Sequence, residues 1–463
     1  MLKFYLITDT HYYDYEACGL SGHRDQVTWN ESGPILDAVF DKLAAKTDSD
    51  IVLIAGDLSC NGQTVCHEGF IKKLQRLKES GKRIFVITAS HDYGQAGFNA
   101  TRATEPRKEV TCREELFDMY ADYGFRDAIA YYAEDPLSYV AQLAPGYRLL
   151  VLNTDGDRDF SGLMNWAEAQ LQQAKQDDQF MFAMHHYPVL SPSPVYPLLA
   201  ANDVLFNKVP GSAEQLADAG LRFVFTGHTH MQNISFEETE QGNRLYDINT
   251  GAAVGYPAPI RSVVIDDENM IIKTESIDSF EWDMQGKSVQ QYLADHFDRM
   301  LNNMFEAANR DPVELLNILA GEFSVNKEAL LKYKFFLRIG GKFLYKITFG
   351  GLGRLLFCKR KIDKSVRRIR LKDFVPEVVR NIYGGDEPYS KDTAVGSAVY
   401  VLMTRISKLG KPFLKGLPFE LPDFVASLLY DPTPDGNAVL PLVSPPPKPC
   451  CEECEENEEC ATE

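Results

Sequence analysis

Short apolar runs alternate with amphipathic stretches along roughly the first 275 residues of the chain. The apolar runs are rich in Val, Ile and Phe, which is typical of strands buried on both faces. They occupy residues 3–8, 50–56, 82–88, 147–153, 179–184 and 221–227. In the intervening stretches 33–46, 68–81 and 163–175, apolar residues recur at helical spacing. Such alternation of strands and helices predicts a layered α/β domain.

The pattern changes twice towards the C-terminus. After Gly242, residues 244–249 and 259–267 are shorter strand candidates without long helices between them, which predicts a second, more antiparallel sheet. From about residue 284 the spacing of apolar residues predicts mostly helices, including residues 288–310 and 311–323. The second half of the chain therefore differs in architecture from the first.

We divide the chain at these changes into an α/β domain at residues 1–278, a mostly helical region at 279–440 and a tail at 441–463. The helical region contains a basic segment, residues 327–372, with fifteen Lys or Arg against two acids. The tail is rich in Pro, then in acidic residues and Cys. We expect it to be disordered, with free thiols rather than a bound soft metal, because few apolar residues could form a core.

Composition limits the class of protein. Hydrophobic residues make up 44% and charged residues 25% of the 463 residues, as in ordinary globular proteins. The net charge of −18 argues against nucleic-acid binding by the whole chain, because phosphates would repel it. The sequence shows neither a signal-peptide pattern nor an apolar run long enough to span a membrane, so we expect a cytoplasmic location. Nine cysteines without a disulfide-like spacing fit that expectation.

Acidic and histidine residues follow five of the predicted strands. Open α/β sheets place ligands at the carboxyl ends of their strands, and carboxylates and neutral imidazoles are ligands that borderline divalent metals accept. If these residues converge, they suit two metal ions that share a bridging Asp and stabilise both oxygens of an in-line displacement. The residues are Asp9, His11, Asp57, His91, Asp92, His185, His186, His228 and His230.

The order of these motifs resembles that of the calcineurin-like metallophosphoesterases: D-x-H, G-D, G-N-H-[DE], an isolated His and G-H-x-H. The resemblance spans roughly residues 1–265. It implies an α-β-β-α sandwich, followed here by the mostly helical region, and a centre of two divalent ions (manganese, iron or zinc) that hydrolyses phosphate esters. It also implies that Asp9, His11 and His230 hold the first ion and that Asp57 bridges the two.

The second ion would be held by His228 and by one His of the adjacent pair. His185 fits the family position better because it immediately follows the strand, and His186 is the alternative. The family's Asn, whose amide oxygen completes this site, is replaced by Ser90. A Ser hydroxyl is a weaker ligand, so we expect a weakly held second ion; Asn61 is a more distant substitute for the amide.

The resemblance also implies that His91 protonates the leaving oxygen and that Asp92 orients the His91 ring. Tyr93, which directly follows Asp92, and Arg102, ten residues beyond Asp92, are candidates for substrate contacts. Arg102 is included because a guanidinium pairs well with phosphate. Residues 56–62, GDLSCNG, are similar to the branch that cleaves cyclic nucleotides and glycerophosphodiesters. We therefore expect a metallophosphoesterase, with small phosphodiesters favoured as substrates.

Two questions stay open: whether the domain is catalytic, and what the basic segment contacts. The fold could serve as a catalytically weakened scaffold, as the loss of the Asn at position 90 would allow. The basic segment 327–372 mixes Phe, Leu and Tyr with Lys and Arg, which suits an element lying on an anionic membrane surface. It also suits a helical lobe that packs on the catalytic domain and pairs its cations with that domain's acids; RNA is a third possible partner.

Overall fold

The computed structural model covers the whole chain. It describes residues 1–463 except 22–25, 95–108, 157–158, 195–208, 312, 314–345, 412–418, 434 and 444–463. Arg102, most of the predicted helix at 311–323, residues 327–345 of the basic segment and nearly all of the tail therefore lie outside the described residues.

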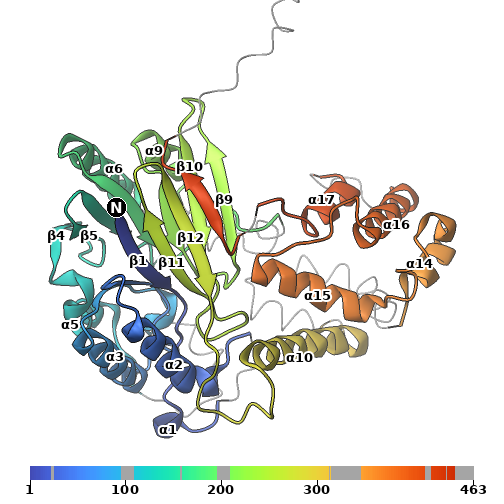
Figure 1. Ribbon diagram of the computed structural model, residues 1–463, viewed down its shortest axis with the longest axis horizontal. Helices are drawn as coiled ribbons and strands as arrows, with labels where there is room; N and C mark the ends of the chain where they lie inside the picture. Colours follow the sequence, from blue (N-terminus) through green and yellow to red (C-terminus); the bar gives the residue numbers. More distant parts are fainter. Residues whose placement is uncertain are drawn as a thin grey trace, which may run out of the picture.

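Two sheets pack face to face in the N-terminal part (Figure 1). The first has the order β13-β12-β11-β1-β2-β3 and the second β4-β5-β6-β7-β8-β10-β9. The first contains β1 (Leu2–Ile7), β2 (Ile51–Ala55), β3 (Arg83–Ile87), β11 (Ile260–Ile265), β12 (Asn269–Glu275) and β13 (Ala438–Pro441). The second contains β4 (Ala128–Tyr131), β5 (Tyr139–Ala144), β6 (Tyr147–Leu152), β7 (Phe180–His185), β8 (Phe223–Thr226), β9 (Asn233–Glu238) and β10 (Arg244–Asn249).

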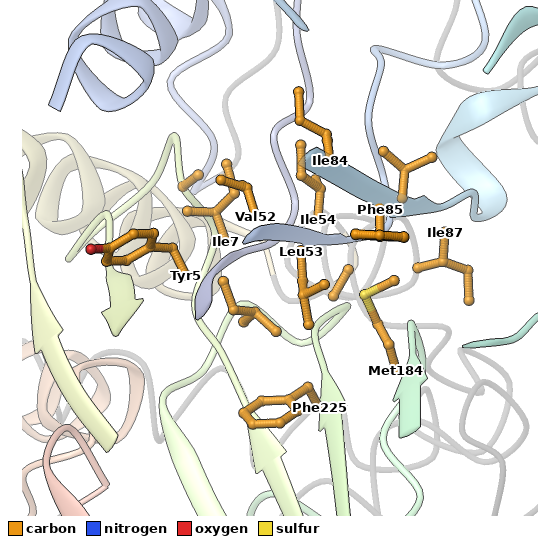
Figure 2. Packing of buried hydrophobic residues seen from close by; sticks show 14 of the residues in the cluster. Tyr5, Ile7, Val52, Leu53, Ile54, Ile84, Phe85, Ile87, Met184 and Phe225 are labelled. Atoms are coloured by element: carbon orange, nitrogen blue, oxygen red, sulfur yellow. The ribbon is translucent and has the colours of Figure 1, made fainter. Parts of the chain in front are cut away.

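Aromatic and aliphatic side chains fill the space between the sheets (Figure 2). The Phe4 ring of β1 stacks on Phe182 of β7 at a centroid distance of 5.1 Å and meets Phe225 of β8 edge-on at 5.4 Å. Leu53 and Met184 belong to the same buried cluster. The apolar runs of the sequence therefore form the inner faces of both sheets, and their side chains make one shared core between the sheets.

Helices cover the outer faces of the sandwich. Apolar side chains of α2 (Ser32–Ala45) and α3 (Thr64–Glu79) belong to the cluster of the first sheet, and those of α6 (Ser161–Gln176) and α9 (Ser212–Asp218) pack on the second. Two further helices are short: α1 (Tyr15–Cys18) and α5 (Leu116–Met119). The predicted α-β-β-α sandwich is confirmed.

The assignment of strands to sheets differs from the sequence-based expectation. The buried parallel runs do not form one sheet, because β1, β2 and β3 pair in the first sheet and β6, β7 and β8 in the second. Residues 244–249 and 259–267 do not make a separate antiparallel sheet either. Instead β10 runs parallel to β8, and β11 runs antiparallel to β1. Each extends one of the two sheets beyond its parallel core.

The C-terminal region is mostly helical, as expected, but the chain then returns to the sandwich. Its described helices are α10 (Val289–Arg310), α14 (Phe349–Leu355), α15 (Leu371–Gly384), α16 (Ala394–Gly410) and α17 (Leu421–Ser427). After them, β13 pairs antiparallel with β12, and the buried Arg261 donates to the backbone carbonyl of Asp435. The boundary at residue 440 thus falls inside a strand, and the helices form an insertion between β12 and β13. None of the described helices is both long and apolar enough to cross a membrane.

Candidate metal centre

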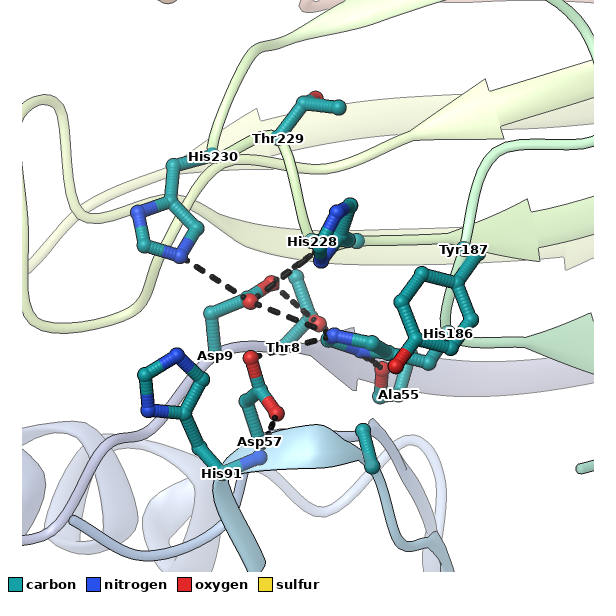
Figure 3. A network of polar contacts seen from close by, with 12 residues as sticks. Thr8, Asp9, Ala55, Asp57, His91, His186, Tyr187, His228, Thr229 and His230 are labelled. Carbon is teal, nitrogen blue, oxygen red and sulfur yellow. Dashed lines mark hydrogen bonds and ion pairs between the residues drawn. The ribbon is translucent and has the colours of Figure 1, made fainter. Parts of the chain in front are cut away.

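Ends of strands from both sheets meet at one edge of the sandwich and bring the predicted motif residues together (Figure 3). Three groups of side chains there place one ligand atom each within 4.8 Å of the others: Asp9, His11 and His230; His11, Asp57 and His91; and Asp57, His186 and His228. Five of these residues have left-handed backbone conformations, with φ of 36° to 66°: Asp9, His11, Asp57, His228 and His230. Non-glycine residues rarely adopt this conformation, and such strain concentrates at functional sites.

The first group is arranged as ligands of a single ion would be. The Nε2 atoms of His11 and His230 lie 3.1 Å apart, and His230 Nε2 is 3.1 Å from Asp9 Oδ1. His11 Nε2 is 3.7 Å from the same oxygen. Two ligand atoms about 2.1 Å from one ion at angles near 90–125° are roughly 3.0–3.7 Å apart. The three residues therefore fit a divalent metal.

The group formed by Asp57, His186 and His228, which would be the second metal site, contains His186 rather than His185. His186 Nδ1 donates to the carbonyl of Ala55 at 2.8 Å, and its Nε2 lies 3.2 Å from Asp57 Oδ2. A backbone acceptor on one ring nitrogen fixes the tautomer and leaves the other nitrogen for a metal. With His228, these side chains form a second cluster suited to a cation.

The preference for His185 is corrected by this geometry. The ring of His185 turns to the other face of β7, where Nε2 contacts the hydroxyl of Thr154 at 2.8 Å and Nδ1 bonds the carbonyl of Tyr187. Successive side chains of a strand point to opposite faces. His186, the residue just beyond β7, therefore points to the same inner face as Phe182 and Met184.

Asp57 lies between the two groups. Its Oδ2 is 3.2 Å from His186 Nε2 and 3.8 Å from His11 Nε2. Its Oδ1 accepts a hydrogen bond from the backbone N–H of His91 at 3.0 Å, which fixes the carboxylate plane. This is the position that a bridging ligand requires.

The charges of the cluster compensate one another. Burial alone would lower the pKa of His186, but the charges of Asp57 and Asp9 raise it to about 10. Burial likewise opposes ionisation of Asp57, but the charges of His186 and His91 hold its pKa well below the ordinary value. Burial, followed by the charge of His186, lowers the pKa of His228 to about 3. The buried carboxylate of Asp57 is ionised and is stabilised by nearby positive charge, and the imidazole of His228 is neutral. Ionised carboxylates and neutral imidazoles are the donors that divalent cations bind.

The turn after β3 holds His91 in a way that the sequence did not indicate. The His91 Nδ1 atom pairs with the Oδ1 of Asn61 at 2.9 Å. The carboxylate of Asp92 instead accepts backbone N–H groups of Ser59 and Ala89, each at 2.8 Å. Asp92 therefore fixes the turn, and Asn61 is the residue bonded to the imidazole. The assignment of Asp92 as the orienting partner is corrected.

Ser90 is connected to the second group through a neighbouring tyrosine. Its side chain hydrogen-bonds with Tyr187, whose hydroxyl donates to Asp155. The Tyr187 ring lies edge-on to His228 and His186, with centroid distances of 4.6 and 5.0 Å. Tyr187 and Asp155 were not among the residues predicted from the sequence, although Tyr187 directly follows the histidine pair.

Two residues of the segment between α1 and α2 contact histidines of the first group. The side-chain amide of Gln26 pairs with Nδ1 of His230, and the ring of Trp29 lies edge-on to His11 at 5.1 Å. Neither was singled out from the sequence, because nothing in their local pattern indicates which loop residues fold back over the strand ends. Tyr93, a candidate for substrate contact, is only 7% exposed and belongs to the hydrophobic core, so its contact with a substrate stays a prediction.

Comparison with known proteins agrees with this geometry. Residues 2–232 match the family described as calcineurin-like phosphoesterase. This half of the chain therefore belongs to the calcineurin-like phosphoesterases, and phosphate esters are the substrates of that family.

Solved structures with similar chains include a dimetal phosphatase from Danio rerio, with 13% identity over 59% of this chain and 96% of that one and a TM-score of 0.43. Purple acid phosphatase PPD1 from yellow lupin has 12% identity over 59% of this chain and 51% of its own, with a TM-score of 0.40. NAD nucleotidase from Haemophilus influenzae has 12% identity over 75% of this chain and 61% of its own, with a TM-score of 0.32. No curated protein matches the sequence significantly.

Proposed function

We propose that the protein is a phosphoesterase with two divalent metal ions that hydrolyses small phosphodiesters. The observation that carries this proposal is the position of Asp57, whose Oδ2 lies within 4 Å of a histidine nitrogen from each of the two ligand groups. When bound, two such ions would supply an activated water or hydroxide and stabilise the charge of the phosphoryl oxygens.

The chain's own residues would hold and orient this centre. Asp9, His11 and His230 are the proposed ligands of one ion and Asp57 is the shared ligand. The proposed ligands of the other ion are His186 and His228, with a weak contribution from Ser90. The donor set contains carboxylate oxygens and imidazole nitrogens without thiolate, which suits manganese, iron or zinc.

His91 is the proposed general acid. Because the Oδ1 of Asn61 can only accept a hydrogen bond, it holds a proton on His91 Nδ1 at 2.9 Å. A second proton on Nε2 then makes the ring an acid that can protonate the leaving oxygen. The proximity of His91 to His11 and Asp57 places it beside the ligand cluster.

The preference for phosphodiesters rests on the similarity of residues 56–62 to the branch of the family that cleaves cyclic nucleotides and glycerophosphodiesters. A cytoplasmic location stays a prediction, and so does a substrate contact by Arg102. Binding of nucleic acid as a partner is disfavoured by the net charge of −18.

A test uses bis(4-nitrophenyl) phosphate and the full chain. We expect turnover when Mn²⁺ is supplied and none after dialysis against a chelator, with recovery when Mn²⁺ is added back. Metal analysis of the purified protein should find two ions per chain at saturation. Two bound ions without turnover of any phosphomonoester, phosphodiester or cyclic nucleotide would favour the scaffold alternative instead.

Position 90 should control the affinity for the second ion. Because a hydroxyl is a poorer ligand than an amide oxygen, we expect Mn²⁺ titration by calorimetry to give two separate affinities, with activity following the weaker one. Ser90→Asn should tighten the weaker affinity by roughly 10-fold and lower the Mn²⁺ concentration that activity requires. Ser90→Ala is the matched control, since it removes the hydroxyl without adding an amide. Equal affinities in all three proteins would show that residue 90 does not contribute to the site.

A further inference from the structure

The basic segment presents a cluster of cations on the outside of the helical region. Its described part, residues 346–372, contains ten Lys or Arg and a single acid, Asp363. The exposed cations are Lys346, Arg354, Arg360, Lys361, Lys364, Arg368 and Arg370. None of these seven cations forms an ion pair with another described residue, whereas Lys372 at the end of the stretch lies 3.9 Å from the adjacent Asp373. Pairing with the described acids of the catalytic domain therefore does not account for these cations.

The apolar residues of the same stretch are packed inside the helical region. Phe349, Cys358, Ile362 and Val366 are buried with the Phe374 ring of α15, in a cluster separate from the core of the sandwich. Phe349 and Phe374 meet edge-on at 5.0 Å. The described segment is thus part of a folded lobe with its own core, and its cations are held in place on the lobe surface.

Two large apolar side chains among these cations are exposed to solvent. Phe357 is 88% exposed and Leu355 is 54% exposed. Phe357 has a left-handed backbone, with φ of 56°, at the point where the N–H of Cys358 bonds the carbonyl of Gly353 and closes α14. Glycine is the residue usually found in this conformation at a helix end. Neither burial nor backbone preference explains a phenylalanine here.

We propose that this cationic tip binds the anionic surface of a lipid bilayer; the tip consists of Arg354, Leu355, Phe357, Arg360, Lys361 and Lys364. The four cations would lie against anionic headgroups, and the two apolar side chains would enter the boundary between headgroups and acyl chains. A polyanion such as RNA offers the same charge but no apolar medium for Leu355. Figure 1 shows α14 at the end of the helical region remote from the two sheets, so the contact leaves the phosphoesterase site uncovered.

Cosedimentation of the full chain with vesicles tests the proposal. We expect the protein to pellet with phosphatidylcholine vesicles that contain phosphatidylglycerol and to stay in the supernatant with phosphatidylcholine alone. About 0.5 M salt should release most of it, because screening weakens the attraction between cations and headgroups.

Variants separate the charge contribution from the apolar one. Each cation near an anionic membrane contributes roughly fivefold to affinity, so the triple variant Arg360→Gln, Lys361→Gln, Lys364→Gln should weaken binding roughly 100-fold. The double variant Leu355→Ser, Phe357→Ser should also weaken binding, and its residual binding should be released at lower salt. Matched controls at exposed positions of the sandwich should bind normally; they are the triple variant Lys72→Gln, Lys175→Gln, Lys273→Gln and the single variant Ile129→Ser.

Three outcomes would overturn the proposal. The first is no sedimentation with anionic vesicles, and the second is an equal loss in the sandwich controls. The third is binding to a single-stranded RNA oligomer that depends on the three cations while the Leu355→Ser, Phe357→Ser variant binds both RNA and vesicles normally. Turnover of a soluble phosphodiester should be the same in all these variants, so failure of this proposal is distinguishable from failure of the proposed activity.

Discussion

Asp57→Asn should abolish metal-dependent phosphodiester turnover, with a loss of at least about 10³-fold in kcat/KM. The substitution keeps the shape of the side chain and an oxygen that can accept the N–H of His91. It removes the negative charge that lies between His11 and His186 and places an amide NH₂ where Oδ2 faces both histidines. Calorimetric titration with Mn²⁺ should therefore find one weak site or none, and circular dichroism should show the secondary structure unchanged.

Asp247→Asn provides a control for general damage to a buried carboxylate. Asp247 accepts N–H groups of Val189 and Leu190 and a bond from the Thr226 hydroxyl, and it belongs to none of the three ligand groups. This variant should unfold at a lower temperature but retain the two-ion stoichiometry. Full activity of Asp57→Asn, or an equal loss of bound metal in both variants, would contradict a dinuclear centre shared by Asp57.

The motif residues could be predicted because strand ends are local features of a sequence. Asp9 and Asp57 directly follow buried apolar runs, and parallel strands bring their carboxyl ends to one edge. The division of those strands between two sheets could not be predicted in the same way, because runs of Val, Ile and Phe do not specify their neighbours. Pairing of β1 with β11, more than 250 residues away, is decided by the whole sandwich.

The error at the histidine pair has a different origin. The alternation along β7 puts residue 186 on the same face as Phe182 and Met184, but both faces of this strand are apolar, and only the structure shows which of them meets the other sheet. Proximity to the strand end was the wrong criterion. By contrast, the contacts of Asn61 with His91 and of Gln26 with His230 depend on how loops fold over the site, for which the sequence has no periodic signal.

His91→Ala should slow hydrolysis of a phosphodiester with an alkyl leaving group by about 10²- to 10⁴-fold. An alkoxide is a poor leaving group and needs the proton that His91 would donate, whereas nitrophenolate leaves without one. The loss for bis(4-nitrophenyl) phosphate should therefore be much smaller than the loss for the alkyl ester. Both rates are measured at saturating Mn²⁺, so that any change in metal affinity does not enter the comparison.

Asn61→Ala is the matched companion to this variant, because it keeps the imidazole and removes the oxygen that lies 2.9 Å from Nδ1. It should show a weaker form of the same dependence on the leaving group, since the ring keeps its proton but loses its orientation. The metal content of both variants should equal that of the unmodified protein. Loss of one ion in His91→Ala would instead make His91 a ligand beside His11 and Asp57, with which it shares a cluster. An equal slowing of alkyl and nitrophenyl esters at constant metal content would leave His91 a role in positioning the substrate and would remove the general acid from the mechanism.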